Sequence, residues 1–260
     1  EKKKKKYEEH IEELKTFINK STETADGKKV MLAANIGGAD EAAKAVKAGA
    51  EGVGLFRTEF LFLNKNALPT EEEQFEEYKK AAVLTKGMPL TIRTLDIGGD
   101  KDIPYMGLTK ETNPFLGYRA IRFCLDRVDI FTTQLRAILR ASAYGSIRIM
   151  IPMITSVNEV RQVKDMIKKI CSDLDHNGIS YDKNIQTGVM IETPAAAIMA
   201  DAIAQEVDFF SIGTNDLTQY TIAVDRCNEN VAYLYSAFNP AVLRLIRRII
   251  ECAHNAGIEA

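Results

Sequence analysis

Short, continuous apolar runs alternate with amphipathic segments along most of the chain. The runs cover residues 30–36, 52–56, 90–97, 147–151, 188–191 and 209–212. Such runs are typical of strands that are buried on both faces of a parallel sheet. Between them, apolar residues recur at helical spacing over residues 42–48, 71–84, 131–143, 157–174 and 194–205. The pattern therefore predicts an α/β domain made of repeated βα units.

Two features favour a TIM (β/α)8-type barrel over an open, doubly wound sheet. Polar and charged residues follow several successive runs, as expected for a site at the carboxyl ends of barrel strands. No glycine-rich dinucleotide or phosphate-binding signature follows the first run, so the usual marker of the open sheet is absent. Six runs are found where a full barrel needs eight, and a further helix is expected over residues 240–256. We therefore expect an incomplete barrel with six of its eight βα units.

The first 20 residues follow a different pattern. They are highly charged, but five apolar residues recur at helical spacing and form one stripe: Tyr7, Ile11, Leu14, Phe17 and Ile18. Residues 21–28 lack an apolar period and contain the turn signal Asp26-Gly27. The sequence thus predicts a linker helix within residues 1–25, followed by a C-terminally truncated barrel domain over residues 26–260.

Composition narrows the function. The formal net charge of -2 and the pI near 6.1 give no overall electrostatic reason to bind nucleic acid or an anionic membrane. A small anionic substrate must therefore be held by local charge. The four cysteines form no CxxC pair, which argues against a zinc site or a disulfide framework and favours the cytoplasm. No apolar stretch is long enough to span a bilayer.

One arginine follows the second run, and another lies within the third. Arg57 directly follows an apolar strand, and Arg93 lies inside one, where an unpaired charge is costly unless it faces a ligand or a partner. The structural alternatives are a pair between Arg57 and Glu59, and a pair of Arg93 with Asp96 or Glu59. Further along, Lys101 follows two glycines in a loop that could approach an anion, although two glycines are more often just a turn.

Carboxylates follow the fifth and sixth runs. Glu192 ends the run 188–191, and Asp216 follows the run 209–212 with Asn215 beside it. Two carboxylates at adjacent strand ends offer hard oxygen ligands for Mg²⁺, or for Mn²⁺. The alternative is that both carboxylates cap helices. Arg226 comes next in the chain, again near the expected rim.

Together, several arginines around a dicarboxylate metal site describe a pocket for a small ligand that carries both phosphate and carboxylate. The planar fork of arginine matches both groups, and a divalent ion could stabilise an enolate. Phosphoenolpyruvate has this charge pattern.

Five motifs carry a resemblance to a known family. They are GLFRTEF (54–60), TLDIGGDK (94–101), NPFLGYRAIR (113–122), GVMIETPAAA (188–197) and DFFSIGTNDLTQYTIAVDR (208–226). The chain resembles the C-terminal, phosphoenolpyruvate-binding domain of Enzyme I of the bacterial sugar phosphotransferase system, the phosphoenolpyruvate-protein phosphotransferase. The likeness covers nearly the whole chain after the first helix.

The resemblance implies roles for individual residues. Arg57, Arg93 and Arg226 match substrate-binding arginines, Asn215 and Asp216 match the substrate-contacting pair, and Glu192 and Asp216 match the Mg²⁺ ligands. It also implies that Lys101 and Arg119 join the phosphate shell, although a lone arginine early in a helix is usually solvated.

The resemblance further implies the course of the reaction. Phosphoenolpyruvate gives its phosphoryl group to a histidine on a separate N-terminal domain and then to the phosphocarrier protein HPr, in the service of sugar uptake. The acceptor histidine and the cysteine that protonates enolpyruvate in the family match no residue of this sequence, so no catalytic residue is assigned and this chain alone is expected to be inactive. A homodimer is expected for the complete protein.

Two alternatives stay open at this point. One is a Mg²⁺-dependent lyase or aldolase that acts on enolates, since such barrels also pair an arginine with two acidic ligands. The other is a non-catalytic, ligand-responsive dimerisation module.

Overall fold

The computed structural model describes residues 2–18, 20–63, 65–98, 103–107 and 110–260. Its centre is a single sheet of six strands in the order β1-β2-β3-β4-β5-β6, and each strand runs parallel to the next. The strands are β1 (Ala33–Ile36), β2 (Gly52–Arg57), β3 (Leu90–Arg93), β4 (Ile147–Ile151), β5 (Gln186–Ile191) and β6 (Phe210–Ile212).

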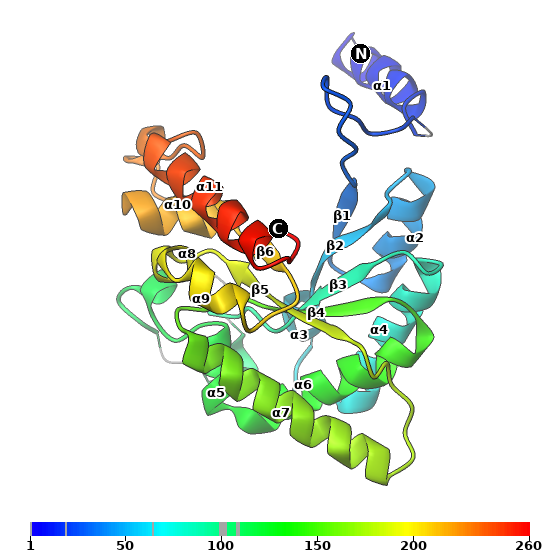
Figure 1. Ribbon diagram of the computed structural model, residues 1–260. Helices are drawn as coiled ribbons and strands as arrows, with labels where there is room; N and C mark the ends of the chain where they lie inside the picture. The colour runs from blue at the N-terminus through cyan, green and yellow to red at the C-terminus, as the bar shows by residue number, and fades with distance from the viewer. Residues whose placement is uncertain (1, 19, 64, 99–102, 108–109) are drawn as a thin grey trace.

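The strand order decides between the two architectures that the sequence left open. A doubly wound sheet reverses its strand order at a switch point, whereas here every strand pairs with the next one in the chain. The sheet curls as part of a barrel, so the expectation of an incomplete TIM-type barrel with six strands is confirmed (Figure 1). Beyond β6, Glu259 forms an isolated parallel bridge with Phe209.

The helices after β1 connect the strands and cover the outside of the sheet (Figure 1). The helices of the chain are α1 (Lys2–Lys15), α2 (Ala39–Lys47), α3 (Glu59–Leu63), α4 (Glu71–Leu84), α5 (Ile121–Asp126), α6 (Val128–Ala141), α7 (Val157–His176), α8 (Pro194–Ile198), α9 (Ala200–Ala204), α10 (Thr214–Ile222) and α11 (Pro240–Asn255). Single 3-10 turns form η1 (Pro104–Met106), η2 (Pro114–Leu116), η3 (Ser142–Tyr144) and η4 (Ala232–Leu234). Among the described residues, no helix is long and apolar enough to cross a membrane.

Two of the longer helices begin with a reciprocal capping box. In α4 the cap is Thr70, whose side chain accepts from the amide of Glu73, and in α7 Ser156 accepts from Glu159 in the same way. Each box satisfies backbone donors that the first turn of a helix leaves free. These caps account for the agreement of both helix starts with the sequence pattern.

The core lies between the sheet and its outer helices. Its largest fully buried side chains include Phe56 on β2, Tyr78 on α4 and Phe131 on α6. Helix α4 packs against both α2 and α6. The aromatic rings of Phe56 and Tyr78 meet edge to face at 5.7 Å. This packing fixes the strands from outside, so their carboxyl ends are held at one rim.

Helix α1 stands apart from the sheet (Figure 1). The observed helix ends at Lys15, so it is shorter than the apolar stripe predicted and does not include Phe17. Tyr7, Leu14 and Phe17 are all exposed. These three residues of the stripe are therefore open to solvent, whereas Ile11 and Ile18 are partly buried. The proposed boundary near residue 25 stays a prediction.

Candidate functional site

The carboxyl ends of β2 and β3 bring two arginines side by side. β2 ends at Arg57 and β3 ends at Arg93, and the parallel register pairs these two residues. The guanidinium carbon of Arg57 lies 4.8 Å from the centre of the Phe60 ring. Because parallel strands end at a common rim, both cations belong to one site.

The guanidinium of Arg93 lies between two carboxylates. Its Nη2 donates to Glu59 Oε1 at 2.8 Å, and its Nη1 lies 3.1 Å from Asp96 Oδ2. Burial is the largest effect on the pKa of Arg93 and lowers it, but the carboxylates together raise that pKa above its usual value. The ion pairs that the sequence left open for Arg93 are thus present, and its contact with a ligand stays a prediction.

Arg119 is buried as well, at 3% exposure, although its sequence position suggested a solvated side chain. Its Nη2 donates to Asp96 Oδ1 at 3.0 Å, and its Nη1 donates to the Tyr220 hydroxyl at 3.1 Å. The same Nη1 lies 3.5 Å from Asp216 Oδ1. Asp96 therefore joins two arginines, and Arg119 connects the β3 end to helix α10.

Asp216 lies in the first turn of α10 and is 8% exposed. The Nη1 of Arg226 lies 3.8 Å from its Oδ1, so Asp216 faces both Arg119 and Arg226. Asn215 does not join this group, because its side chain is exposed and its Oδ1 accepts from the Tyr235 hydroxyl at 3.3 Å. The structure thus brings together every arginine and carboxylate predicted for the α10 side of the site.

Glu192, at the end of β5, is fully buried. Its Oε1 accepts from the Met153 amide at 2.6 Å, whereas the cap of helix α8 is Thr193. The capping alternative for Glu192 is therefore wrong. Desolvation, followed by the charges of Asp96 and Asp216, raises the pKa of Glu192 to about 8 against the lowering effect of Arg93.

Four buried polar atoms of the site have no hydrogen-bond partner in the described part of the chain. They are Nε of Arg57, Nε of Arg93, Nε of Arg119 and Oε2 of Glu192. A buried donor or acceptor without a partner costs about 1 to 3 kcal/mol, so native proteins rarely leave several of them together. Three open cationic donors and one open carboxylate oxygen are what an anionic ligand and a cation would satisfy.

The two carboxylates suit a magnesium ion, which needs few protein ligands, better than a metal that is bound by protein side chains alone. Within the described ranges, no group of three or more histidine, cysteine, aspartate or glutamate side chains could hold a metal ion. Magnesium is usually bound through one or two carboxylates, with water and substrate oxygens completing its octahedron. The open oxygen of Glu192 is compatible with such a site, as is the charge of Asp216, which acts on Glu192 and raises its pKa.

Lys101, a further candidate for the phosphate shell, lies outside the described residues. The sequence did not point to Tyr220, which holds Arg119 and also donates to the Phe115 carbonyl. An aromatic residue in a helix gives no signal of such a contact.

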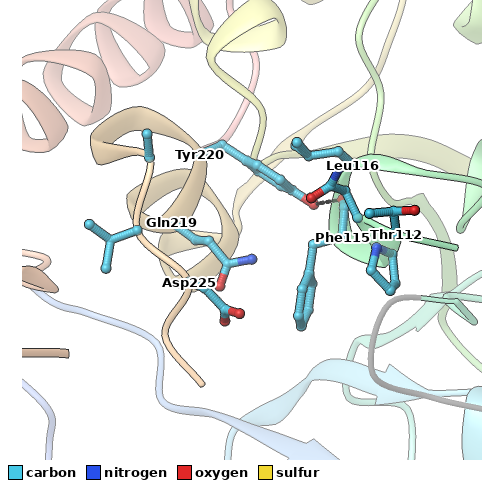
Figure 2. A pocket seen from close by; sticks show the side chains of 10 residues that line it. Thr112, Phe115, Leu116, Gln219, Tyr220 and Asp225 are labelled. Atoms are coloured by element: carbon cyan, nitrogen blue, oxygen red, sulfur yellow. Dashed lines mark hydrogen bonds between the residues drawn. The ribbon is translucent and has the colours of Figure 1, made fainter. Parts of the chain in front are cut away.

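A hollow of about 370 Å³ opens beside these residues, between the segment 112–116 and the end of α10 (Figure 2). Gln219, Tyr220 and Asp225 line one side, and Phe115 lines the other. Because Tyr220 also contacts Arg119, the hollow adjoins the buried charges from the solvent side.

Gly213 gives the first testable prediction. A Cβ at this position would lie 2.5 Å from Glu192 Oε2 and 2.6 Å from Glu192 Cβ. We expect Gly213→Ala to displace the Glu192 carboxylate and to lower the free energy of unfolding by about 1 to 3 kcal/mol. Chemical denaturation measures this loss. Gly178→Ala measures the cost of an alanine where nothing lies within 4 Å of the added Cβ and only the φ of +64° brings strain. A loss below about 1 kcal/mol at Gly213 would contradict the close approach.

Comparison with known proteins identifies the class to which this fold and site belong. Residues 11–260 match the family described as PEP-utilising enzyme, PEP-binding domain, and the chain belongs to that family.

The chain is also similar to particular members with a common name. It is 54% identical over 257 residues to the phosphoenolpyruvate-protein phosphotransferase of Geobacillus stearothermophilus, which covers 99% of this chain and 44% of that protein. It is 53% identical over 241 residues to the protein of the same name from Bacillus subtilis, covering 93% of this chain and 42% of that protein. The chain thus spans less than half the length of these curated relatives.

Among solved structures, an aldolase/citrate lyase family protein from Burkholderia cenocepacia has a similar fold. The TM-score is 0.53 at 13% sequence identity, and the match covers 95% of this chain and 82% of that one. At this identity the likeness concerns the fold alone.

Proposed function

We propose that this chain binds phosphoenolpyruvate together with Mg²⁺ and forms the substrate-binding part of a phosphoenolpyruvate-protein phosphotransferase. The observation that carries the proposal is the set of unpaired buried atoms, three guanidinium Nε groups and Glu192 Oε2, within one cluster of charges. The names of the relatives at 54% and 53% identity support the choice of substrate.

The charges of the site explain why anion and cation would bind together. Four arginines (Arg57, Arg93, Arg119, Arg226) stand against four carboxylates (Glu59, Asp96, Glu192, Asp216). Without a cation, the phosphate and carboxylate of the ligand would be repelled by these acidic groups as well as attracted by the arginines. A divalent cation between Glu192 and Asp216 would remove that repulsion and would neutralise charge that develops on the enolate oxygen.

The side chains of the protein would then have distinct tasks. Arg57, Arg93 and Arg226 would donate to phosphate and carboxylate oxygens, and Arg119 would hold Asp216 in place. Phosphoryl transfer needs chiefly positioning and neutralisation of charge, which arginines that are already held in place would supply without reorganisation. In this proposal the phosphoryl group passes to a histidine on a separate domain and then to HPr, in a cytoplasmic, dimeric protein that serves sugar uptake.

A Mg²⁺-dependent enolate lyase or aldolase is the second candidate. The fold of the Burkholderia cenocepacia protein is compatible with it, but a lyase needs far fewer cations than the four arginines gathered here. The number of guanidinium groups therefore favours a ligand that carries phosphate.

Thermal unfolding with the two kinds of ligand separates these candidates. Phosphoenolpyruvate at about one hundred times its Kd should stabilise the chain by about 2.7 kcal/mol, and only when Mg²⁺ is present. A β-hydroxy acid in its place should have no such effect. Stabilisation and cleavage of the β-hydroxy acid, with none by phosphoenolpyruvate, would instead support the lyase.

A further inference from the structure

Gln134 is a polar residue on the buried face of an outer helix. It lies on α6 next to Leu135 and is 1% exposed. Its Oε1 accepts from the Leu95 amide at 2.8 Å. Its Nε2 lies within donating distance of two hydroxyl oxygens, 3.2 Å from Thr58 Oγ1 and 3.3 Å from the Tyr78 hydroxyl. Both polar atoms of the Gln134 side chain therefore have hydrogen-bond partners inside the protein.

The contact with Thr58 reaches the end of β2. Thr58 is fully buried and lies between Arg57 and Glu59 in the chain. Its hydroxyl accepts from Gln134 and donates to the Arg93 carbonyl at 2.9 Å. Two strand ends are therefore tied to each other and to α6 through one hydroxyl group.

The contact with Leu95 reaches the segment after β3. Leu95 lies between Arg93 and Asp96, and its amide has Gln134 Oε1 as its acceptor. Beyond β3 the Thr94 amide still pairs with β4, because it donates to the Met150 carbonyl at 2.9 Å. After Thr94 the Gln134 amide helps to hold the backbone that carries Asp96, together with the bond from the Ala120 amide to the Ile97 carbonyl.

We propose that Gln134 is a positioning residue of the ligand site, an inference that rests on the proposed function. One side-chain amide fixes the backbone beside Arg57 and Glu59 on one strand end and beside Arg93 and Asp96 on the next. Packing alone does not require an amide among the buried positions of α6, which otherwise include Phe131, Leu135 and Ile138, because an apolar side chain of similar size would fill the space. The amide is instead suited to holding side chains whose geometry decides ligand binding.

The test is the affinity of the 260-residue chain for phosphoenolpyruvate in Mg²⁺, measured by titration calorimetry. Gln134→Leu removes the three contacts with little change in volume and should weaken binding about ten-fold. Thr58→Val removes the shared hydroxyl and should weaken binding in the same direction. The double variant should lose less than the sum of the two single losses, because both changes break the contact between Gln134 and Thr58.

Two control variants separate positioning from general destabilisation. Tyr78→Phe removes another partner of the same amide but keeps the ring that packs against Phe56, and the lost hydroxyl otherwise donates to Gln74. Ser142→Ala removes a buried hydroxyl that accepts from the Asp182 amide. Asp182 comes before β5 in the chain, at the opposite end of that strand from Glu192. Both should lower the melting temperature and leave the affinity unchanged.

Hydrogen exchange of the ligand-free chain gives a readout that does not depend on the proposed function. The Leu95 amide should exchange faster in Gln134→Leu than in Tyr78→Phe at equal global stability. Failure of the wild-type chain to bind phosphoenolpyruvate would sink the proposed function, whereas wild-type affinity in Gln134→Leu, or a loss no larger than in Tyr78→Phe, would overturn the positioning role. If Gln134→Leu does not fold, Thr58→Val against the same controls decides between these outcomes.

Discussion

Replacing Arg93 with lysine is expected to weaken phosphoenolpyruvate binding by on the order of 2 to 4 kcal/mol, although the charge is kept. The fork of Arg93 reaches Glu59 and Asp96 at once, at 2.8 and 3.1 Å, inside a region where all three side chains are at most 8% exposed. A lysine ammonium is a point charge and cannot bridge both carboxylates while it also faces a ligand. Calorimetric titration in Mg²⁺ measures the loss.

The same substitution should also lower the stability of the ligand-free chain. It leaves a buried carboxylate with a poorer partner, which costs about 1 to 3 kcal/mol. Arg136→Lys is the matched control, because Arg136 also bridges two carboxylates, Glu71 and Asp173, but lies at the more exposed surface between α4, α6 and α7. If Arg93→Lys keeps wild-type affinity, Arg93 has only the structural role of holding Glu59 and Asp96.

Glu192→Gln should stabilise the metal-free chain at pH 8, by on the order of 2 to 4 kcal/mol. The folded protein raises the pKa of Glu192 to about 8 from an ordinary 4.5. The proton therefore favours the folded state. This contribution is complete below pH 4.5 and is lost as the pH rises through 8, where the unfolded chain is ionised without penalty. A glutamine keeps the acceptor for the Met153 amide and cannot ionise.

Melting temperatures of both proteins in a chelator, from pH 5 to pH 8, check this prediction. The advantage of Glu192→Gln should be small at pH 5 and should grow steadily toward pH 8. The order should reverse when Mg²⁺ and phosphoenolpyruvate are added, because the ion stabilises the ionised carboxylate. A difference that does not change with pH would mean that Glu192 has an ordinary pKa.

Most strands could be predicted from the sequence because each is a buried apolar run, but burial and strand pairing do not end at the same residue. Residues 94–97 were expected to continue the third strand, and Leu95 and Ile97 are indeed buried. The ladder with β4 nevertheless stops at Arg93. At the sheet edge the opposite occurs, since residues 30–32 are apolar and exposed and β1 begins only at Ala33.

Helix α10 shows why one part of the site was harder to predict. Its residues TNDLTQYTI have no apolar stripe, and the helix buries Thr218 and Gln219 along with Leu217. Tertiary contacts, such as that between Gln219 and the Arg226 amide, stabilise it in place of an apolar face.

The charged residues of the site were also predicted only in part. The sequence shows which strand ends carry arginine or carboxylate, because strand ends share a rim in this fold. It cannot show that Asp96 joins Arg93 to Arg119, since that contact depends on how the loops after β3 fold. Gln134 was missed for the same reason. A polar residue among the apolar positions of an outer helix was the signal that could have found it.

The most direct test of the account is a titration of phosphoenolpyruvate into the wild-type chain and into a Glu192→Ala, Asp216→Ala double variant, each with Mg²⁺ and with a chelator. We expect binding by the wild-type chain in Mg²⁺ alone and no detectable binding by the double variant under either condition. Circular dichroism of both proteins controls for folding. Binding by a folded double variant that is undiminished in Mg²⁺ would contradict the assignment of these carboxylates, and the same affinity of the wild-type chain with and without Mg²⁺ would contradict the metal-dependent site.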